Sequence, residues 1–397
     1  MKFSSLTERI SGEGSTAWEV HYEGVARKEA GEEVIVLSVG QETDERTPDN
    51  IVNAAIESLQ NGRHHYTPVN GILPLRRAIA RRHEELNGQQ VTAANCAVFA
   101  GAQNALYAVA QCLLEHGDEV ILIEPYYTTY PAAFTASGAT LVSVPVKAEN
   151  GFQIDPEDII KCITERTRAI VVNSPNNPVG AVYTVEQFQP LVNICVEKDI
   201  WLVSDEVYLE ILPAEERCSP SSLPGADKVC ISISSLSKSH RMTGWRLGWV
   251  VGPENLMANL KNLSMCMCYG LPPFIMDAGV EALNSGSEVA NEVCRTLSRR
   301  RQILVESMEQ AKGVEIYSAV GGMFVVLDVR SFDVSGQEFA WELLNRHNIS
   351  ILPCDGFGRT GAGLLRVSLC VSDEQMVVAC QRIVEFVEFL NGGGSAE

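Results

Sequence analysis

A single lysine and a nearby arginine follow one short apolar run in a chain that is otherwise acidic. The segment "SSLSKSHRMTGWRLGW", residues 234–249, places Lys238 among small residues and Arg246 eight positions later. A lysine whose surroundings lower its pKa becomes a nucleophile that forms a Schiff base with an aldehyde. An arginine offers a planar fork for a phosphate group. The segment therefore predicts a site for a phosphorylated aldehyde, and the alternative is a pair of ordinary surface cations.

Two further loops place polar groups after predicted strands. "CAVFA" is followed by a predicted helix whose first residues are Gly101, Ala102 and Gln103. Free amides at a helix amino end attract anions, and glycine lets a phosphate approach closely. "VVNSPNNPVG" presents Asn177 in a turn. A plain strand-to-helix turn and an ordinary proline-bounded turn are the competing interpretations.

The last two strand ends add a carboxylate and hydroxyl groups. "WLVSDEVY" carries a strand directly into Asp205, with Tyr208 three residues later, and "VCISIS" leads to Ser235 and Ser237. A carboxylate at the end of a buried strand needs a partner, and a protonated ring nitrogen would serve; capping of a helix is the alternative. Together the loops describe a ligand with a phosphate, an aldehyde and a basic ring nitrogen. Pyridoxal 5'-phosphate has all three.

The elements that must position these groups have the pattern of an α/β protein. From about residue 95, short apolar runs alternate with amphipathic ones, as in a mostly parallel sheet with crossover helices. Predicted strands are "CAVFA", "EVILIE", "TLVSVPV", "AIVVN", "WLVSDE", "VCISIS" and "LGWVVG", and predicted helices include 103–115 and 185–198. In such a sheet the chemistry lies beyond the carboxyl ends of the strands.

The pattern changes after "PPFIMDAG". A long polar helix is predicted at about 281–311, followed by strands in "GGMFVVLDV", "ISILPC" and "LLRVSLC" and by helices near 336–347 and 373–391. This predicts a smaller α+β domain. We expect an N-terminal segment at 1–45 that packs near the active site, a large domain at 46–280, the small domain at 281–391, and a flexible tail at 392–397.

Composition excludes several classes of protein. Fifty acidic against 31 basic side chains give a net charge of -19, which repels nucleic acid and anionic lipid. No apolar run reaches the roughly 18 residues that a membrane span needs, and "MKFSSLTERI" lacks the apolar core of a signal peptide. We therefore expect a cytoplasmic protein. The twelve cysteines lack the repeated CxxC spacing of a zinc site, so buried free thiols and no metal are predicted.

"NSPNNPVG", "SDEVY" and "SLSKSHRMTGWRLGW", in this order, resemble the class I/II aminotransferases of fold type I, the pyridoxal-phosphate-dependent transferase fold, over nearly the whole chain. The resemblance implies that Lys238 carries the Schiff base to the cofactor and that Asp205 pairs with its ring nitrogen. Asn177 and Tyr208 would hold its phenolic oxygen. The phosphate would be held by residues in three loops: Ser235, Ser237, Arg246 and the amides of Ala102 and Gln103 after Gly101.

The resemblance also implies roles for residues outside those loops. Tyr127 in "EPYYTTY" takes the place of an aromatic residue that stacks on the cofactor ring, with a core aromatic as the alternative. Tyr66 would reach the phosphate of a neighbouring subunit, which implies a homodimer with shared active sites. Arg366 would clamp the substrate carboxylate, and Gly40 would end a strand beside it.

The implied reaction moves the amino group of an L-amino acid to a 2-oxo acid by a ping-pong mechanism. Lys238 would serve twice, first holding the cofactor and then moving the proton of the substrate Cα. "RISGEGSTAWEVHYEGVARKEAGEEVIVLSVG" and "GAQNALYAVAQCLL" are closer to arginine:pyruvate transaminases than to aspartate, aromatic or alanine enzymes. Arginine or another basic amino acid is therefore the expected donor, and pyruvate the expected acceptor.

One segment departs from the family. A proline usually stands two residues after the glycine that matches Gly40, but this chain reads "GQETDERTP", with Glu42 in that position. One hypothesis is that an acidic residue near here faces the pocket and pairs with the cationic end of the substrate; the candidates are Glu13, Glu42, Asp44 and Glu45. The alternative is a solvated acidic loop.

Other functions share the same cofactor residues. Aminotransferases for aromatic or neutral amino acids, and pyridoxal-phosphate-dependent lyases, cyclases and oxidases, remain alternatives. A further alternative, an effector domain of a transcription regulator, would need an amino-terminal DNA-binding domain. We do not expect such a domain, because the aminotransferase-like part takes up nearly all of the given sequence, and the acidity of the chain also argues against DNA.

Overall fold

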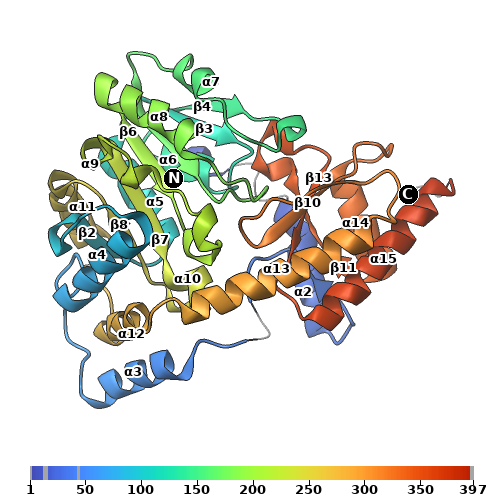
Figure 1. Ribbon diagram of the computed structural model, residues 1–397, viewed down its shortest axis with the longest axis horizontal. Helices are drawn as coiled ribbons and strands as arrows, with labels where there is room; N and C mark the ends of the chain where they lie inside the picture. The colour runs from blue at the N-terminus through green and yellow to red at the C-terminus, as the bar shows by residue number, and fades with distance from the viewer. Residues whose placement is uncertain (1, 12–16, 43–44, 394–397) are drawn as a thin grey trace.

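The largest element of the protein is a seven-stranded sheet (Figure 1). The computed structural model describes residues 2–11, 17–42 and 45–393. The strand order across the sheet is β2-β8-β7-β6-β5-β3-β4. The strands are β2 (Cys96–Phe99), β3 (Glu119–Glu124), β4 (Thr140–Pro145), β5 (Thr167–Asn173), β6 (Trp201–Asp205), β7 (Cys230–Ser235) and β8 (Gly248–Val251).

The sheet is parallel except for β8, which runs antiparallel to both β7 and β2. The predicted mostly parallel sheet is therefore confirmed. Asn173 at the end of β5 lies opposite Asp205 at the end of β6, so the two polar strand ends reach the same edge. The strands are rich in β-branched residues that are buried on both faces, as is typical of a parallel sheet covered by helices.

Helices cover both faces of this sheet. One face packs against α5 (Ala102–Leu113), α6 (Tyr130–Thr135) and α11 (Glu254–Met267). The other packs against α7 (Pro156–Ile160), α8 (Val185–Lys198) and α9 (Ala226–Val229). Residues of β2 and β8 also form a core with α3 (Asp49–Gln60), α4 (Leu73–Asn87) and α12 (Pro273–Asn284). The short helix α10 (Leu236–Ser239) directly follows β7.

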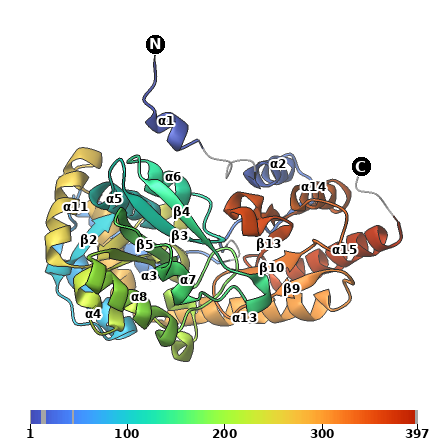
Figure 2. The same cartoon turned by 90° about the horizontal axis from the view of Figure 1, so that it is seen from above.

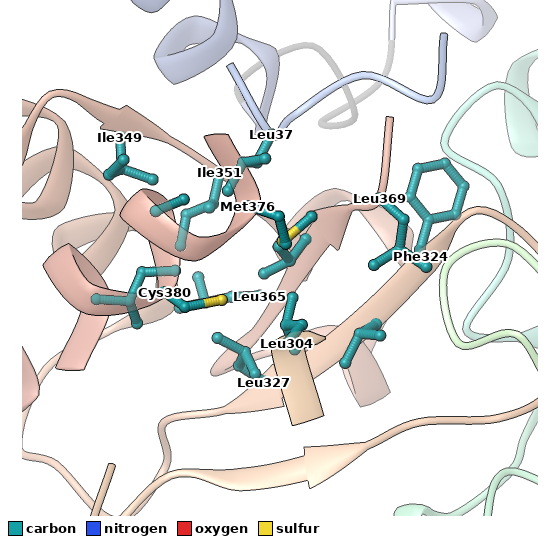
Figure 3. Packing of buried hydrophobic residues seen from close by; sticks show 14 of the residues in the cluster. Leu37, Leu304, Phe324, Leu327, Ile349, Ile351, Leu365, Leu369, Met376 and Cys380 are labelled. Atoms are coloured by element: carbon teal, nitrogen blue, oxygen red, sulfur yellow. The ribbon is translucent and has the colours of Figure 1, made fainter. Parts of the chain in front are cut away.

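The C-terminal part contains a four-stranded antiparallel sheet of order β12-β13-β10-β9. These strands are β9 (Glu315–Tyr317), β10 (Phe324–Asp328), β12 (Leu352–Pro353) and β13 (Leu364–Ser368). They pack against α13 (Glu288–Met308), α14 (Gly336–His347) and α15 (Asp373–Asn391) in a separate apolar core, part of which Figure 3 shows. A large α/β part and a smaller α+β part are thus present, as the sequence predicts.

Two N-terminal elements pack with the C-terminal part. Strand β1 (Ile35–Val36) pairs in parallel with β11 (Ile349–Ser350), and helix α2 (Glu19–Glu29) lies beside α14 (Figure 2). The first helix, α1 (Leu6–Arg9), contacts the large part instead, because Arg9 Nη2 donates to the carbonyl of Ala136 at 2.8 Å. The domain limits 1–45, 46–280, 281–391 and 392–397 stay predictions.

The helix predicted at 281–311 is two helices. Helix α12 ends at Asn284 and α13 begins at Glu288. The break contains Gly286, whose φ of 79° lies in the left-handed region that favours glycine. The predicted span was therefore wrong at its start, while α13 still runs from the large part to the small one (Figure 1). No helix in the described part of the chain is long and apolar enough to cross a membrane.

Candidate active site

A cavity of about 250 Å³ opens at the carboxyl ends of the parallel strands. It lies where β5, β6 and β7 end and where α5 and α10 begin. Eleven residues predicted from the sequence line it: Gly40, Ala102, Gln103, Tyr127, Asn177, Asp205, Tyr208, Ser235, Ser237, Lys238 and Arg246. The fold therefore brings together residues that are far apart in the chain. The sheet does this because parallel strands present their carboxyl ends at one edge.

Lys238 lies on α10, directly after β7, and points into the cavity. Its Nζ donates a hydrogen bond to the carbonyl of Gly40 at 2.6 Å. The same Nζ lies 5.8 Å from the centre of the Tyr208 ring. The amine is surrounded by protein but keeps contact with the cavity, so a ligand there can reach it.

Burial lowers the pKa of Lys238 to about 8, because the charged form loses its hydration. The positive charges of Arg366 and Arg246 act in the same direction, while Cys370 and Asp205 oppose them. An ordinary lysine has a pKa near 10.4. A substantial fraction of Lys238 is therefore a neutral amine near pH 8, which is the form that attacks an aldehyde.

Asp205 ends β6 as a buried carboxylate with its oxygens on the cavity side. Tyr130 Oη donates to Asp205 Oδ2 at 2.5 Å, and the amide of Val207 donates to Oδ1 at 3.2 Å. Burial raises the pKa of Asp205 to about 6, although both hydrogen bonds oppose the shift. No lysine or arginine within residues 2–11, 17–42 and 45–393 forms an ion pair with it. A protonated ring nitrogen bound in the cavity would pair with the negative charge of Asp205.

Asp205 does not cap a helix, since the amide it accepts from belongs to the turn after β6. Its neighbour Glu206 points elsewhere. Glu206 Oε1 accepts hydrogen bonds from Ser219 at 2.6 Å and from Ser232 at 3.3 Å, and Glu206 does not line the cavity. Two adjacent carboxylates thus face different surroundings.

A chain of hydrogen bonds joins the cavity to a buried arginine behind it. Arg366 Nη1 donates to Asn177 Oδ1 at 2.9 Å, and Asn177 Nδ2 donates to Tyr208 Oη at 3.4 Å. Arg366 also donates to the carbonyl of Ser38 at 2.6 Å, and its guanidinium lies 4.0 Å from the Phe324 ring centre. Among the described residues it is the largest fully buried side chain, at 1% exposure, although it does not line the cavity.

Arg366 carries a buried positive charge that needs an anion. Its Nε finds no hydrogen-bond acceptor among the residues that the structure describes. A buried charge without a partner is costly, and a carboxylate bound in its fork would supply both the charge and the acceptors. Trp18 from the N-terminal segment closes one side, with its ring centre 5.8 Å from the guanidinium carbon.

The amino end of α5 forms another wall. Gly101 precedes this twelve-residue helix with φ 85°, and a Cβ on Gly101 would overlap the Arg246 guanidinium, so the position requires glycine. The first amides of α5, from Ala102 onward, have no partner within the helix. Arg246 Nη1 donates to the carbonyl of Thr243 at 2.7 Å. This combination of helix amides and a guanidinium suits a phosphate.

Serines complete this wall. Ser235 Oγ accepts from the amide of Ser237 at 3.3 Å, and both residues line the cavity. Tyr127 lines it as well, with its ring edge-on to Tyr130, the centroids 5.9 Å apart. Sequence reasoning missed Tyr130, the hydrogen-bond donor to Asp205. The available signal was a further tyrosine in "EPYYTTY", three residues after Tyr127 and at the start of α6.

Three other predicted residues, Tyr66, Glu42 and Glu45, do not line the cavity. Tyr66 is 88% exposed and packs its ring edge against Tyr269. Glu42 is buried and paired with Arg300 of its own chain, so the structure does not place its carboxylate toward a substrate. Glu45 is exposed and does not line the cavity. Glu13 and Asp44 lie outside the described residues.

Among the described residues, neither the cysteines nor the possible metal ligands form a metal centre. All twelve cysteines are free, and Cys266 and Cys268 are exposed. The part of the chain that the structure describes holds no group of three or more histidine, cysteine, aspartate or glutamate residues that could bind a metal ion.

Comparison with known proteins identifies the family. The family model "Aminotransferase class I and II" matches residues 32–383. An arginine–pyruvate transaminase of Pseudomonas aeruginosa is 47% identical over 383 residues, covering 96% of this chain and 97% of that protein. A probable aspartate/prephenate aminotransferase of Aquifex aeolicus is 34% identical over 368 residues, covering 90% and 92% of the two chains.

A solved structure agrees with this assignment. The aspartate aminotransferase from Thermus thermophilus with maleate superimposes with a TM-score of 0.91 at 30% sequence identity, covering 97% of this chain and 99% of that one. The family match spans most of the chain, and the fold and the loop geometry agree with it. The chain is therefore an aminotransferase of the class I and II family.

Proposed function

We propose that this enzyme transfers the amino group of L-arginine, or of another basic L-amino acid, to pyruvate, with pyridoxal 5'-phosphate bound in the cavity described above. The observation that carries the proposal is that Lys238 and Asp205 open into one cavity whose wall is the amino end of α5. Lys238 can react with an aldehyde, Asp205 can pair with a basic ring nitrogen, and the amides of α5 can bind a phosphate.

The residues fit this cofactor on three counts. Asp205 has a raised pKa and no cationic partner among the described residues, so a protonated ring nitrogen would stabilise it. Lys238 has a lowered pKa and contacts the cavity. The glycine at position 101 leaves room for Arg246 beside the α5 amides. When bound, pyridoxal 5'-phosphate supplies an aldehyde that joins an amine and a ring that accepts the electrons released at the substrate Cα.

The chain's own residues would then divide the work. Arg366 would bind the substrate carboxylate. Arg366 also donates a hydrogen bond to Asn177, and Asn177 donates one to the Tyr208 hydroxyl, so the three side chains hold one another in place. Lys238 Nζ takes up the proton released at the substrate Cα. Asp205 keeps a proton on the ring nitrogen of the cofactor, and Tyr130 holds Asp205 in place. Ser235, Ser237, Arg246 and the first amides of α5 would hold the phosphate, and Tyr127 would pack on the cofactor ring, because these residues line the cavity.

A second hollow supports a donor with a long side chain. A groove of about 1470 Å³ adjoins the cavity, and Tyr127 lines both. Its other walls include the rings of Trp18, Tyr22 and Tyr126. Guanidinium groups stack favourably on aromatic faces. The similarity to an arginine–pyruvate transaminase points to the same donor and acceptor.

We also propose that two chains form a homodimer in which Tyr66 of one chain reaches the phosphate site of the other. The support is the position of Tyr66, which is 88% exposed, together with the exposed ring of Tyr269 beside it. Large exposed aromatic groups are typical of surfaces that become buried on association.

The test of the proposed function is a donor and acceptor screen. We expect the enzyme, loaded with pyridoxal 5'-phosphate, to form one L-alanine from pyruvate for each L-arginine that loses its amino group. Arginine should exceed norleucine and aspartate as donor. Pyruvate-independent release of ammonia, or consumption of oxygen, would instead identify a lyase or an oxidase. Failure of every basic donor, with activity on neutral or aromatic ones, would overturn the substrate assignment.

The lowered pKa of Lys238 predicts how its reactivity depends on pH. In the full chain without cofactor, reductive methylation of Lys238 by formaldehyde and cyanoborohydride should rise with pH, reach half of its maximum near pH 8 and level off at about pH 9, because only the neutral amine reacts. Peptide mass spectrometry measures it, with the exposed Lys261 as the internal standard for the reagent. Labelling of Lys238 that continues to rise steeply above pH 9 would contradict the lowered pKa.

A further inference from the structure

The segment after Gly40 is tied to the surroundings of the active site at three points. The Gly40 carbonyl accepts the hydrogen bond from Lys238 at 2.6 Å. Two residues later, Glu42 forms an ion pair with Arg300. Further on, Thr47 Oγ1 donates to the carbonyl of Arg241 at 2.7 Å. The position where the family usually has proline thus holds a buried acid in this chain.

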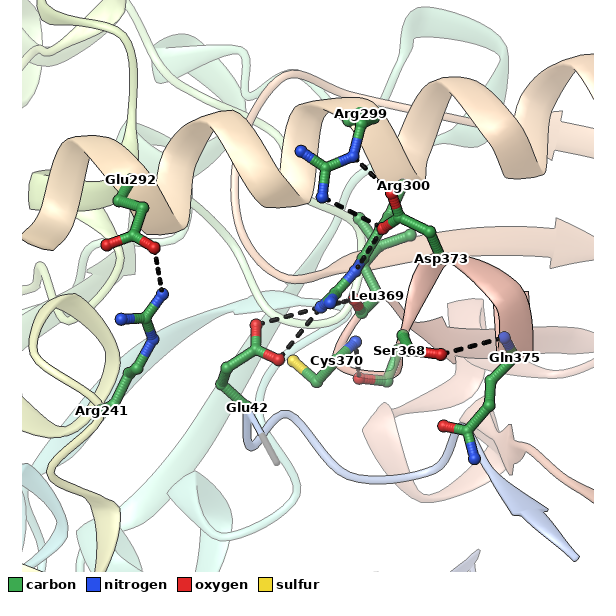
Figure 4. A network of polar contacts seen from close by, with 11 residues as sticks. Glu42, Arg241, Glu292, Arg299, Arg300, Ser368, Leu369, Cys370, Asp373 and Gln375 are labelled. Carbon is green, nitrogen blue, oxygen red and sulfur yellow. Dashed lines mark hydrogen bonds and ion pairs between the residues drawn. The ribbon is translucent and has the colours of Figure 1, made fainter. Parts of the chain in front are cut away.

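The ion pair of Glu42 and Arg300 is buried on both sides. The side chains are 3% and 5% exposed, and Arg300 Nη1 lies 3.0 Å and 3.1 Å from the two carboxylate oxygens of Glu42. Arg300 also donates to the carbonyl of Leu369 and, through Nε, to Asp373 at 3.1 Å (Figure 4). A buried ion pair is a weak source of stability, and fixing a local geometry is its better attested role.

This cluster and Lys238 have a common neighbour, Cys370. The charges of both Glu42 and Lys238 act on the Cys370 thiol, so the three groups share one neighbourhood. Gly40 itself packs closely, because a Cβ at this position would come within 2.5 Å of the Phe324 ring. Two residues span at most about 7 Å of chain. The ion pair of Glu42 therefore anchors the chain within about 7 Å of the Gly40 carbonyl that contacts Lys238.

We propose that Glu42 is a positioning residue for Lys238. Held by Arg300, it fixes the Gly40 carbonyl where that carbonyl accepts a hydrogen bond from the lysine amine. The inference rests on the proposed role of Lys238 as the base that takes the proton from the substrate Cα. After that transfer Nζ is an ammonium, and a hydrogen bond from a charged donor is stronger than one from a neutral amine. The contact therefore favours the protonated lysine and promotes the transfer.

The expected result for Glu42→Gln is a lower kcat with little change in KM. We expect kcat to fall about 10-fold and KM to stay within about 3-fold, because the lost interaction strengthens only during proton transfer. The acidic limb of the kcat–pH profile should move to lower pH, since a less stabilised ammonium has a lower pKa. The other titratable or charged groups that act on Lys238 are unchanged in this variant: Asp205, Arg246, Arg366 and Cys370.

Two adjacent arginines provide the matched control. Arg299 and Arg300 both bind Asp373, but Arg300 makes the contact with Glu42. Arg300→Gln should reproduce the kinetic changes of Glu42→Gln, and the double variant should add little, because the pair acts as a unit. Arg299→Gln should keep the wild-type kcat and pH profile.

Two outcomes would overturn the role of Glu42. One is a Glu42→Gln enzyme with the kcat and pH profile of the wild type. The other is an Arg299→Gln enzyme that loses as much as Arg300→Gln. If the wild type turns over no donor, the proposed function fails instead. Formaldehyde labelling of Lys238 then decides the role of Glu42 on its own: the labelling midpoint must move to lower pH in Glu42→Gln, and an unchanged midpoint refutes the role.

Discussion

Replacing Lys238 by alanine is expected to abolish the visible absorbance of the bound cofactor and to lower kcat by about 10⁴-fold or more. Lys238 is asked to do two things, to bind the cofactor aldehyde and to move the Cα proton. Its amine is the nitrogen that lines the cavity with a pKa lowered to about 8 by burial. Absorbance spectra of the purified variant with pyridoxal 5'-phosphate, and the rate of alanine formation from arginine and pyruvate, measure both effects.

Lys228 is the control for this substitution. It is exposed and precedes β7, whereas Lys238 follows the same strand at its other end. Lys228→Ala should keep both the absorbance and the turnover. Normal turnover in Lys238→Ala would refute the assignment of the catalytic lysine, whatever the identity of the amino donor.

The strand ends could be predicted because their pattern is local. Asn173, Asp205 and Ser235 each end a short, mostly apolar strand in which all but one residue is buried. A parallel sheet brings such ends together without further information. The helices at 185–198, 336–347 and 373–391 were also predicted with the bounds that the structure gives, because each has a polar or acidic residue at its start and a clear apolar periodicity.

Pairings between distant residues could not be predicted in this way. Glu42 and Arg300 are 258 positions apart, and the sequence offered Glu42 only as one of many carboxylates. Arg366 and Asn177 are separated by 189 positions. Nothing in local periodicity indicates which buried acid meets which buried base, because the partner is chosen by the packing of two separate cores. The association of β1 with β11 was missed for the same reason.

The second large effect is expected for Asp205→Asn. This variant should retain the cofactor on Lys238 but lose about 10²–10³-fold in kcat/KM, since a neutral amide no longer holds a proton on the ring nitrogen. Asparagine can still accept from Val207 and meet the Tyr130 hydroxyl, so the local structure should survive. The loss should therefore appear as a chemical defect in an enzyme that still shows visible absorbance.

The same substitution should stabilise the protein without its cofactor. Burial raises the pKa of Asp205 to about 6, so ionisation of this group above that pH lowers the free energy of unfolding. A rise of about 2 units in the pKa of an acid corresponds to a destabilisation of up to about 3 kcal/mol at pH 7, which Asp205→Asn would relieve. Below about pH 3, where the carboxyl is mostly protonated in both states, the difference should vanish. Thermal unfolding of the two cofactor-free proteins at pH 7 and at low pH measures it.

Glu206→Gln is the control for Asp205→Asn, because it removes a buried carboxylate at the same strand end that does not face the cavity. Glu206 is the next residue, equally buried, but its carboxylate faces Ser219 and Ser232 and not the cavity. This variant should keep kcat/KM within about 3-fold, because its side chain touches no reacting group. A loss in Glu206→Gln as large as that in Asp205→Asn would mean that the end of β6 matters for packing alone. If activity is lost only in Asp205→Asn and this variant is also more stable, Asp205 serves catalysis although it destabilises the folded protein.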